Sequence, residues 1–325
     1  MKYRVQKYPI FVPYLATRIM KARFINPYTD YGFKKIFGEE ASKPLLIDFL
    51  NALLLARQKI TTLYFKNLEQ LGPSHIDRKA IFDIYCENDK GEKFIVELQK
   101  AKHNFFKDRT VYYATFPILD QTEKGDWNYR LQHVYCIGIL DFTFDDYESE
   151  PERSEVIHTV QLKNQNNRLF YDKLTFVYLE MPNFSKTEEQ LTTRIDQWLY
   201  FIKHLEDFQQ IPTIFKDDVF TQAFEKAELA NMGQKEINVY EDSLKTYRDL
   251  KGVIDTAYYE GLIEGRLEGH KEGKEEGKIE TEIKGKKEVI VIGYKEGLSV
   301  KILAKLTKMT EEEVMEIIKN IPPEE

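Results

Sequence analysis

The sequence predicts an α/β fold in which a mixed β-sheet is flanked by helices, followed by a C-terminal helical region. Helical and strand-like hydrophobic patterns alternate over residues 21–185. Within that core, two strand patterns are separated by a turn-forming segment, which predicts a β-hairpin. Long helical patterns then continue toward the C-terminus. With 325 residues, the chain is long enough for one sizeable core and a smaller appendage.

The first patterned segment is a helix that begins near Asp30 or Ser42. Gly38 is expected to interrupt or cap its first part. Its apolar residues follow a 3.6-residue period and are Phe33, Ile36, Phe37, Leu45, Leu46, Phe49, Leu50, Leu53 and Leu54. Residues 1–20 are interpreted as an N-terminal extension, and the true start, Met1 or Met20, stays open.

The hairpin follows, with strands predicted at Lys79–Cys86 and Lys93–Gln99 and a turn at Asn88–Gly91. A helix is then predicted from about Asn104 to Glu123, because aromatic residues recur there at helical spacing. We interpret these residues as core, with a base-stacking surface as the alternative. They are Phe105, Phe106, Tyr112, Tyr113 and Phe116.

The remaining segments complete the sheet and the helical region. Strands are predicted near 132–140, 155–162 and 173–181, and helices near 187–208 and 217–259. The predicted divisions are a core at 21–185, a helical region at 186–259, a charged tether at 260–297 and a helix pair at 298–325.

Glycine recurs every four residues in the tail. These glycines are Gly261, Gly265, Gly269, Gly273 and Gly277, with Gly285, Gly293 and Gly297 in the same phase. A four-residue period drifts by about 40° per step around a helix, so the glycines form a slowly wrapping stripe. Each interior glycine costs about 1 kcal/mol relative to alanine. Two interpretations stay open: a partly helical tether, or a helix packed on the protein body or on a second copy in a homodimer.

The last segment predicts two short helices, at Ser299–Lys308 and Thr310–Lys319. Thr310 and Glu313 have the spacing of a capping box. This pair is either a DNA-binding element or a cap for the tail.

Composition excludes several classes of protein. A hydrophobic content of 42% is too high for a disordered chain. No apolar run approaches the roughly 20 residues that span a bilayer, so no membrane association is expected. Pro9 and Pro13 interrupt the early apolar patch, which makes it a poor signal peptide. Cys86 and Cys136 lie in strand-like runs and are expected to be buried free thiols of a cytoplasmic protein.

The charge is distributed unevenly along the chain. Residues 1–125 contain 21 Lys and Arg against 14 Asp and Glu, a net charge of +7, whereas residues 126–325 contain 26 against 40, a net charge of −14. Attraction to phosphate is local, so a basic first half is compatible with DNA as a partner despite the overall charge of −7.

Acidic residues on the hairpin point to a metal site. No histidine or cysteine spacing indicates zinc, so oxygen ligands are expected. If paired residues have numbers that sum to 180, Asp83 lies directly opposite Glu97, with Cβ atoms about 5 Å apart. Such a pair suits Mg²⁺, with the Leu98 carbonyl as a further ligand, and the corresponding chemistry is phosphodiester hydrolysis. A one-residue shift in register would separate the two acids.

The combination of segments resembles a known family. Asp83 followed by Glu97-Leu98-Gln99 is similar to the D…(D/E)X(K/Q) signature of PD-(D/E)XK nucleases. The run from Asn26 to Gly38, NPYTDYGFKKIFG, resembles the opening of the recombination-promoting nuclease (Rpn) family, also labelled PD-(D/E)XK transposases. The stretch from Phe106 through Arg109 to Tyr113 and the glycine-periodic tail are similar as well.

The resemblance implies a restriction-endonuclease-like core and roles for particular residues. Asp83 and Glu97 would bind Mg²⁺ or Mn²⁺, with Asp30 as an additional ligand, and no small-molecule cofactor is expected. Gln99 would replace the superfamily's catalytic lysine. Arg109 would then supply the positive charge near the scissile phosphate that the lysine otherwise provides. The candidate DNA contacts are Lys34, Lys35, Lys100 and Lys102.

Each role has a simpler alternative. The two acids could lie on a half-exposed strand, and Arg109 could pair on the surface with Asp108 or Glu123. Lys34 and Lys35 could be solvated helix residues instead of phosphate contacts. The predicted function is a Mg²⁺-dependent DNA endonuclease of recombination or mobile elements. The alternative is an inactive nuclease-like module that binds DNA or a partner protein.

Overall fold

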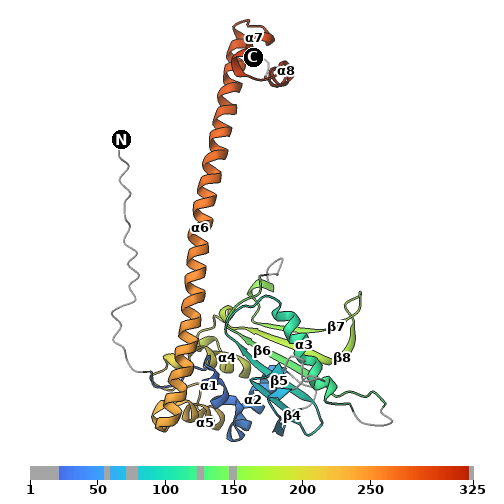
Figure 1. Cartoon of the computed structure of the whole chain (residues 1–325), viewed down its shortest axis with the longest axis vertical. Helices are drawn as coiled ribbons and strands as arrows, with labels where there is room; N and C mark the ends of the chain where they lie inside the picture. Colours follow the sequence, from blue (N-terminus) through green and yellow to red (C-terminus); the bar gives the residue numbers. More distant parts are fainter. Residues whose placement is uncertain (1–21, 55–58, 71–79, 123–127, 146–151, 322–325) are drawn as a thin grey trace. The chain divides into compact units, whose positions relative to one another are not determined.

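The computed structural model describes residues 22–54, 59–70, 80–122, 128–145 and 152–321. Its centre is a six-stranded sheet with the order β1-β4-β5-β6-β8-β7 (Figure 1). The strands are β1 Leu63–Phe65, β4 Ile84–Asn88, β5 Lys93–Gln99, β6 Val134–Leu140, β7 Ile157–Lys163 and β8 Leu169–Glu180. β6 is parallel to both β5 and β8, and the other neighbours are antiparallel. The predicted mixed sheet is confirmed.

Helices cover both faces of this sheet (Figure 1). One face shares the larger core with α1 Asp30–Phe33, α2 Lys43–Leu54, α4 Arg194–His204 and α5 Asp218–Ala227. The other face shares a smaller core with α3 Phe106–Leu119. Because side chains alternate along a strand, Val96 of β5 enters the larger core and Ile95 enters the smaller one.

The remaining elements are short turns, a small second sheet and the C-terminal helices. The π turn is Lys34–Gly38, and the 3₁₀ turns are Glu40–Ser42, Glu152–Ser154, Met181–Asn183, Glu188–Gln190, Leu205–Asp207 and Leu229–Asn231. The small sheet pairs β2 Glu69–Gln70 with β3 Ala80–Ile81, and the C-terminal helices are α6 Gln234–Lys295, α7 Val300–Thr307 and α8 Glu311–Lys319. The chain divides into two compact units, residues 1–251 and 252–325.

The strand predicted at 79–86 is divided. β3 belongs to the small sheet, and β4 begins only at Ile84. Phe82 and Asp83 lie at the bend between them, where the Phe82 N–H donates to the Leu68 carbonyl at 2.9 Å. Phe82 therefore packs in the smaller core. The two-residue alternation of a strand over 79–86 predicts instead that Phe82 shares the face of Ile84, which lies in the larger core, and that prediction is wrong. The bend interrupts the two-residue alternation on which that prediction depended.

The helix predicted over 217–259 is also interrupted, between α5 and α6. There Glu228 has extended backbone and forms an isolated antiparallel bridge with Phe24. The Arg23 guanidinium donates to the Glu228 carboxylate at 2.8 Å. These partners are about 200 residues apart in the sequence, so no local pattern could indicate the break.

The second unit contains the predicted C-terminal helix pair. Leu303 of α7 and Val314 of α8 are buried in one small core with Ile290 of α6. Thr310 and Glu313 form the predicted capping box at the start of α8. Within this unit the helix pair caps the end of α6. This packing favours the interpretation of the pair as a cap for the tail over the interpretation as a DNA-binding element.

The glycine-periodic segment is helical throughout α6. A Cβ atom built on its glycines would meet nothing within 4 Å; these are Gly261, Gly265, Gly269, Gly273, Gly277 and Gly285. Gly293 differs, because a Cβ atom there would lie 2.5 Å from Leu303 Cδ2. Packing of the stripe on a second copy stays a prediction. No helix in the described ranges is long and apolar enough to cross a membrane.

His133, just before β6, is half-buried and held in one orientation. Its Nε2 lies 2.9 Å from Thr175 Oγ1, and its ring stacks on Tyr135 with centroids 3.8 Å apart. Burial lowers the pKa of His133 to about 4; Lys173 acts in the same direction and Asp172 opposes it. The folded protein therefore keeps this ring neutral at pH values where the unfolded chain protonates it.

This difference predicts a pH dependence of stability. The unfolded chain binds a proton near the ordinary pKa of 6.5 and the folded chain only near 4, so the free energy of unfolding should decrease as pH falls from about 6.5 to 4. The His133→Gln variant should lose this part of the slope in urea unfolding measured at several pH values. Parallel curves for the two proteins would contradict the prediction.

Candidate active site

Two acidic side chains of the β4–β5 hairpin meet on the face that α3 covers. β4 and β5 pair with Ile84 opposite Val96, so the numbers of paired residues sum to 180. This confirms the predicted register. Asp83 lies at the bend just before the first of these pairs, and its N–H donates to the Glu97 carboxylate. Glu97 lies beside α3 residues in a small cavity of about 20 Å³, which Thr110 also lines.

Each acid is oriented by the backbone of the opposite strand. The Leu98 N–H donates to Asp83 Oδ2 at 2.8 Å, and the Asp83 N–H donates to Glu97 Oε1 at 3.1 Å. These two bonds hold both carboxylates in place and use one oxygen of each. The second oxygen of each group remains for another ligand.

The two carboxylates strongly affect each other. Burial raises the pKa of both, and the charge of Asp83 raises the pKa of Glu97 further. Lys34 acts on the pKa of both groups in the opposite direction, as do Lys100 on Asp83 and Arg109 on Glu97. None of the ion pairs in the described part of the chain involves either acid. A cation bound between the two carboxylates would therefore favour their charged forms and offset their repulsion.

These two carboxylates suit a divalent cation that binds few protein ligands, such as Mg²⁺. Among the described residues, no three His, Cys, Asp or Glu side chains lie close enough together to hold a metal ion. Mg²⁺ does not require three, because it usually binds one or two carboxylates and retains water and substrate phosphate as further ligands. Asp83 and Glu97 meet that requirement, and the Leu98 carbonyl stays a predicted ligand.

Gln99 ends β5 and is almost fully buried. Its side-chain Nε2 donates to the Ala101 carbonyl at 2.9 Å, and its Oε1 accepts from Nη2 of Arg109. Both ends of the amide are therefore engaged within the protein. This arrangement differs from a lysine-like side chain that extends toward the substrate.

Arg109 reaches this site from the first turns of α3. Its guanidinium lies 5.3 Å from the Phe106 ring centroid and 5.7 Å from that of Tyr113. Its Nε is buried and has no hydrogen-bond partner among the described residues. The described contacts do not include the alternative pairing with Asp108, and Glu123 lies outside the described residues. The Nε–H of Arg109 is therefore a buried donor without an acceptor among the described residues, and the guanidinium charge lowers the pKa of Glu97.

The turn before α1 is closed by hydrogen bonds that leave no room for a side chain at Gly32. The Asn26 carbonyl accepts from Thr29 Oγ1 at 2.7 Å, and the Thr29 hydroxyl accepts from the Gly32 N–H at 2.9 Å as the helix N-cap. A Cβ atom on Gly32 would overlap the Asn26 carbonyl oxygen and lie 2.7 Å from Thr29 Oγ1. Glycine is therefore required where this turn closes, and the turn places Asp30 and Lys34 near the acids.

Asp30 and the candidate lysines do not all lie near the acid pair. Asp30 pairs with Lys100 at 2.6 Å, and its charge raises the pKa of Asp83, so it is close to the site. Its role as a metal ligand stays a prediction. Lys35 faces α6 and pairs with Glu236 at 2.6 Å. Lys34 is the member of this adjacent pair whose charge acts on both catalytic candidates.

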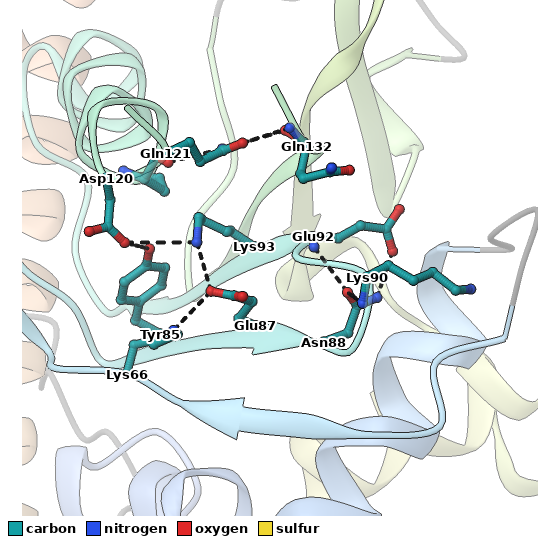
Figure 2. A network of polar contacts seen from close by, with 11 residues as sticks. Lys66, Tyr85, Glu87, Asn88, Lys90, Glu92, Lys93, Asp120, Gln121 and Gln132 are labelled. Carbon is teal, nitrogen blue, oxygen red and sulfur yellow. Dashed lines mark hydrogen bonds and ion pairs between the residues drawn. The ribbon is translucent and has the colours of Figure 1, made fainter. Parts of the chain in front are cut away.

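The hairpin is held at its other end by a polar network that Figure 2 shows. Lys93 donates to Glu87 at 2.7 Å, and Tyr85 donates to Asp120, the C-cap of α3, at 3.2 Å. Lys66 also pairs with Glu87, at 2.9 Å. Contacts at both ends therefore fix α3 on the hairpin, with Arg109 at the end near the acids.

The aromatic residues of the α3 region divide into two groups. Phe106 and Phe116 are buried in the smaller core, and Tyr113 packs against it, as predicted. The core prediction is wrong for Phe105 and Tyr112, which are 79% and 42% exposed. Phe105 precedes the first residue of α3, so the helical period does not place it on the buried face.

A comparison with protein families decides the identity of this fold. A family model described as PD-(D/E)XK nuclease family transposase matches residues 27–257. The chain belongs to this family. The match begins in the segment before α1, includes the acid pair and Arg109, and ends within α6. Searches of curated proteins and of solved structures found no match.

Membership of the PD-(D/E)XK family is consistent with the donor set, because nucleases of this superfamily generally use divalent metal ions. The family signature does not include two contacts of this site. The Ala101 carbonyl holds the Gln99 amide, and the Tyr113 ring packs against Arg109. The four-residue spacing of Arg109 and Tyr113 was a signal for the second contact, because such residues are neighbours on a helix.

Proposed function

We propose that this PD-(D/E)XK family member is a DNA endonuclease that hydrolyses phosphodiester bonds with Mg²⁺, for which Mn²⁺ can substitute. The acid pair carries the proposal: Asp83 and Glu97 are partly buried, mutually repelling and oriented on one face, with Arg109 alongside. The family description connects such proteins with transposition. Recombination or mobile-element DNA is therefore the proposed setting.

Asp83 and Glu97 would hold the cation through the oxygens that the backbone bonds leave available, with the Leu98 carbonyl as a further ligand. A divalent cation in such a position lowers the pKa of a water molecule and offsets negative charge on the reacting phosphate. The backbone N–H groups of Asp83 and Leu98 keep the carboxylates from rotating. Their preorganisation reduces the reorganisation that catalysis would otherwise require.

Arg109 would bind a phosphate oxygen through the guanidinium N–H groups that its bond to Gln99 leaves available, because hydrogen bonds between charged partners are the strongest. Gln99 is proposed as a positioning residue, because both ends of its amide are already engaged and it acts through Arg109. The arginine would thus supply the positive charge that a neutral amide cannot. Lys34 would contribute a second, more distant cation.

Arg109→Lys should lower kcat by about 100-fold although the charge is retained. An ammonium group cannot reproduce the planar contact with two rings or the directed bond to Gln99. Gln99→Ala should also lower kcat. The double variant should have a kcat no lower than that of Arg109→Lys, because the two residues act as one unit. Additive losses would contradict the positioning role. Arg168→Lys, on the β7–β8 turn, is the matched control.

The direct test of the function is nicking of supercoiled plasmid by the full chain with Mg²⁺, with Mn²⁺ and with a chelator. Nicking that requires a divalent cation is expected. If the chain binds DNA but cleaves it under none of these conditions, the alternative of a nuclease-fold binding module replaces the proposal. Cleavage that persists in chelator would exclude the proposed cation site.

A further inference from the structure

Phe105 is the aromatic residue of the α3 region that the fold leaves most exposed. Its side chain is 79% exposed, and its backbone has a φ of 62°, which bulky residues rarely adopt. It lies six residues after Gln99 and four before Arg109, both of which belong to the acid-pair site. Phe105 therefore borders the candidate active site without contributing to the core.

A hollow of about 320 Å³ lies beside Phe105, which we call the Phe105 hollow. It is lined by the first turn of α3 and the loop after β6, including Lys102, Phe105, Lys107, Phe142, Phe144 and Asp145. This volume is at the lower end of the range for small-ligand pockets and suits a single flat ring system. Four phenylalanines contribute to its lining, so the complementary ligand has an apolar face.

The walls of the Phe105 hollow are firmly held. Phe106 contacts Phe142 edge-on, with centroids 5.7 Å apart and planes at 88°. The Phe144 N–H donates to the fully buried Glu180 carboxylate at 3.0 Å. The hollow therefore exists before any ligand binds, and Phe105 supplies its exposed face.

The rim carries two lysines that can bind phosphate, Lys102 and Lys107, beside two acidic residues, Asp108 and Asp145. Lys107 Nζ lies 4.5 Å from the Phe144 ring centroid, and Lys102 pairs with Asp145 in an exposed contact. Exposed ion pairs contribute little stability, so a phosphate can replace Asp145 as the partner of Lys102. α3 also begins here without a side-chain cap, and helix N-termini favour anions.

We propose that the Phe105 hollow binds one unpaired DNA base next to the phosphate that Arg109 contacts, with the base stacked on Phe105. This inference rests on the proposed function, because it places the base relative to that site. Bases within a duplex are covered on both faces by their neighbours, so an exposed aromatic ring stacks on a base only where the DNA is single-stranded or distorted. The preferred substrate is therefore DNA with an unpaired nucleotide beside the cleaved bond.

The test measures base stacking without cleavage. Single-stranded DNA that carries the fluorescent base 2-aminopurine is titrated with the full chain in chelator, and fully paired duplex of the same sequence is titrated in parallel. Stacking should quench the fluorescence of the single strand. Phe105→Ala should abolish the quenching and weaken single-strand binding by about 5- to 150-fold, the usual range for loss of one base–aromatic stack. Phe105→Tyr should retain both properties.

The matched control is Phe170→Ala, because Phe170 is also 79% exposed and lies on β8, outside the Phe105 hollow. It should bind and quench as the wild type does. Equal quenching by wild type and Phe105→Ala would overturn the proposal, as would the absence of quenching at saturating wild-type protein. Thermal unfolding of each variant excludes loss of folding as the cause.

The base-binding proposal and the nuclease proposal fail in different ways. Quenching that depends on Phe105, without cleavage under any cation, would reject the nuclease and retain the base site. Cation-dependent cleavage at equal rates by wild type and Phe105→Ala, on paired and unpaired DNA alike, would retain the nuclease and reject the base site.

Discussion

Glu97→Ala is expected to lower Mg²⁺-dependent cleavage by about 100- to 1000-fold, because it removes one of the two carboxylates that would hold the cation. A cation held by Asp83 alone loses charge, orientation and affinity. Plasmid nicking at several Mg²⁺ concentrations is the appropriate measurement, since weak cation binding and lost catalysis then separate. Cleavage by Glu97→Ala at more than about a tenth of the wild-type rate would contradict the assignment.

The same site gives a stability readout that does not depend on activity. Without divalent cations, Glu97→Gln should raise the melting temperature by a few degrees. Burial and the Asp83 charge raise the pKa of Glu97, so the folded wild type must either protonate this carboxyl or bury its charge, and glutamine removes that cost. The glutamine oxygen can still accept from the Asp83 N–H. Mg²⁺ should stabilise the wild type and have little effect on this variant. Asp89→Asn, in the exposed turn of the same hairpin, should behave as the wild type in both assays.

Gly32→Ala is expected to destabilise the fold by about 3 kcal/mol, toward the upper end for overpacking of a buried position. The added Cβ atom would overlap the Asn26 carbonyl oxygen, which belongs to the backbone and cannot move aside as a flexible side chain could. Urea unfolding would measure the change. A secondary loss of activity is expected, because this turn places Lys34 near the acid pair.

Gly38→Ala is the matched control in the same segment. Its added Cβ atom would meet Lys34 Cβ at 3.5 Å, an ordinary van der Waals distance. A change within about 1 kcal/mol is expected. If Gly32→Ala unfolds no more easily than Gly38→Ala, the close approach of Asn26 and Gly32 is not a constraint on the fold.

Local patterns were sufficient for the hairpin and the acid pair. The bounds of β5 agree with the prediction, and the register that brings Asp83 next to Glu97 followed from the turn residues and the two-residue alternation. The capping box of α8 was also readable, because Thr310 and Glu313 are three residues apart. These features depend on neighbours within about fifteen positions in the sequence.

Features that depend on distant contacts were missed. β1 is a short strand, and its place beside β4 has no pattern of its own. The break between α5 and α6 arises from the contacts of Glu228 with Phe24 and Arg23. Lys34 and Lys35 are adjacent in the sequence, yet only packing against α6 decided that Lys35 turns to Glu236.

The sequence by itself determined the fold class, the family resemblance and the pairing of two acids, because periodicity and turn chemistry act over short distances. Only the tertiary structure decided that Gln99 holds Arg109, that Arg109 keeps an unused donor, and that Phe105 faces a hollow. Such contacts depend on how α3 packs across the sheet, and that packing joins side chains whose relative orientation no local pattern specifies.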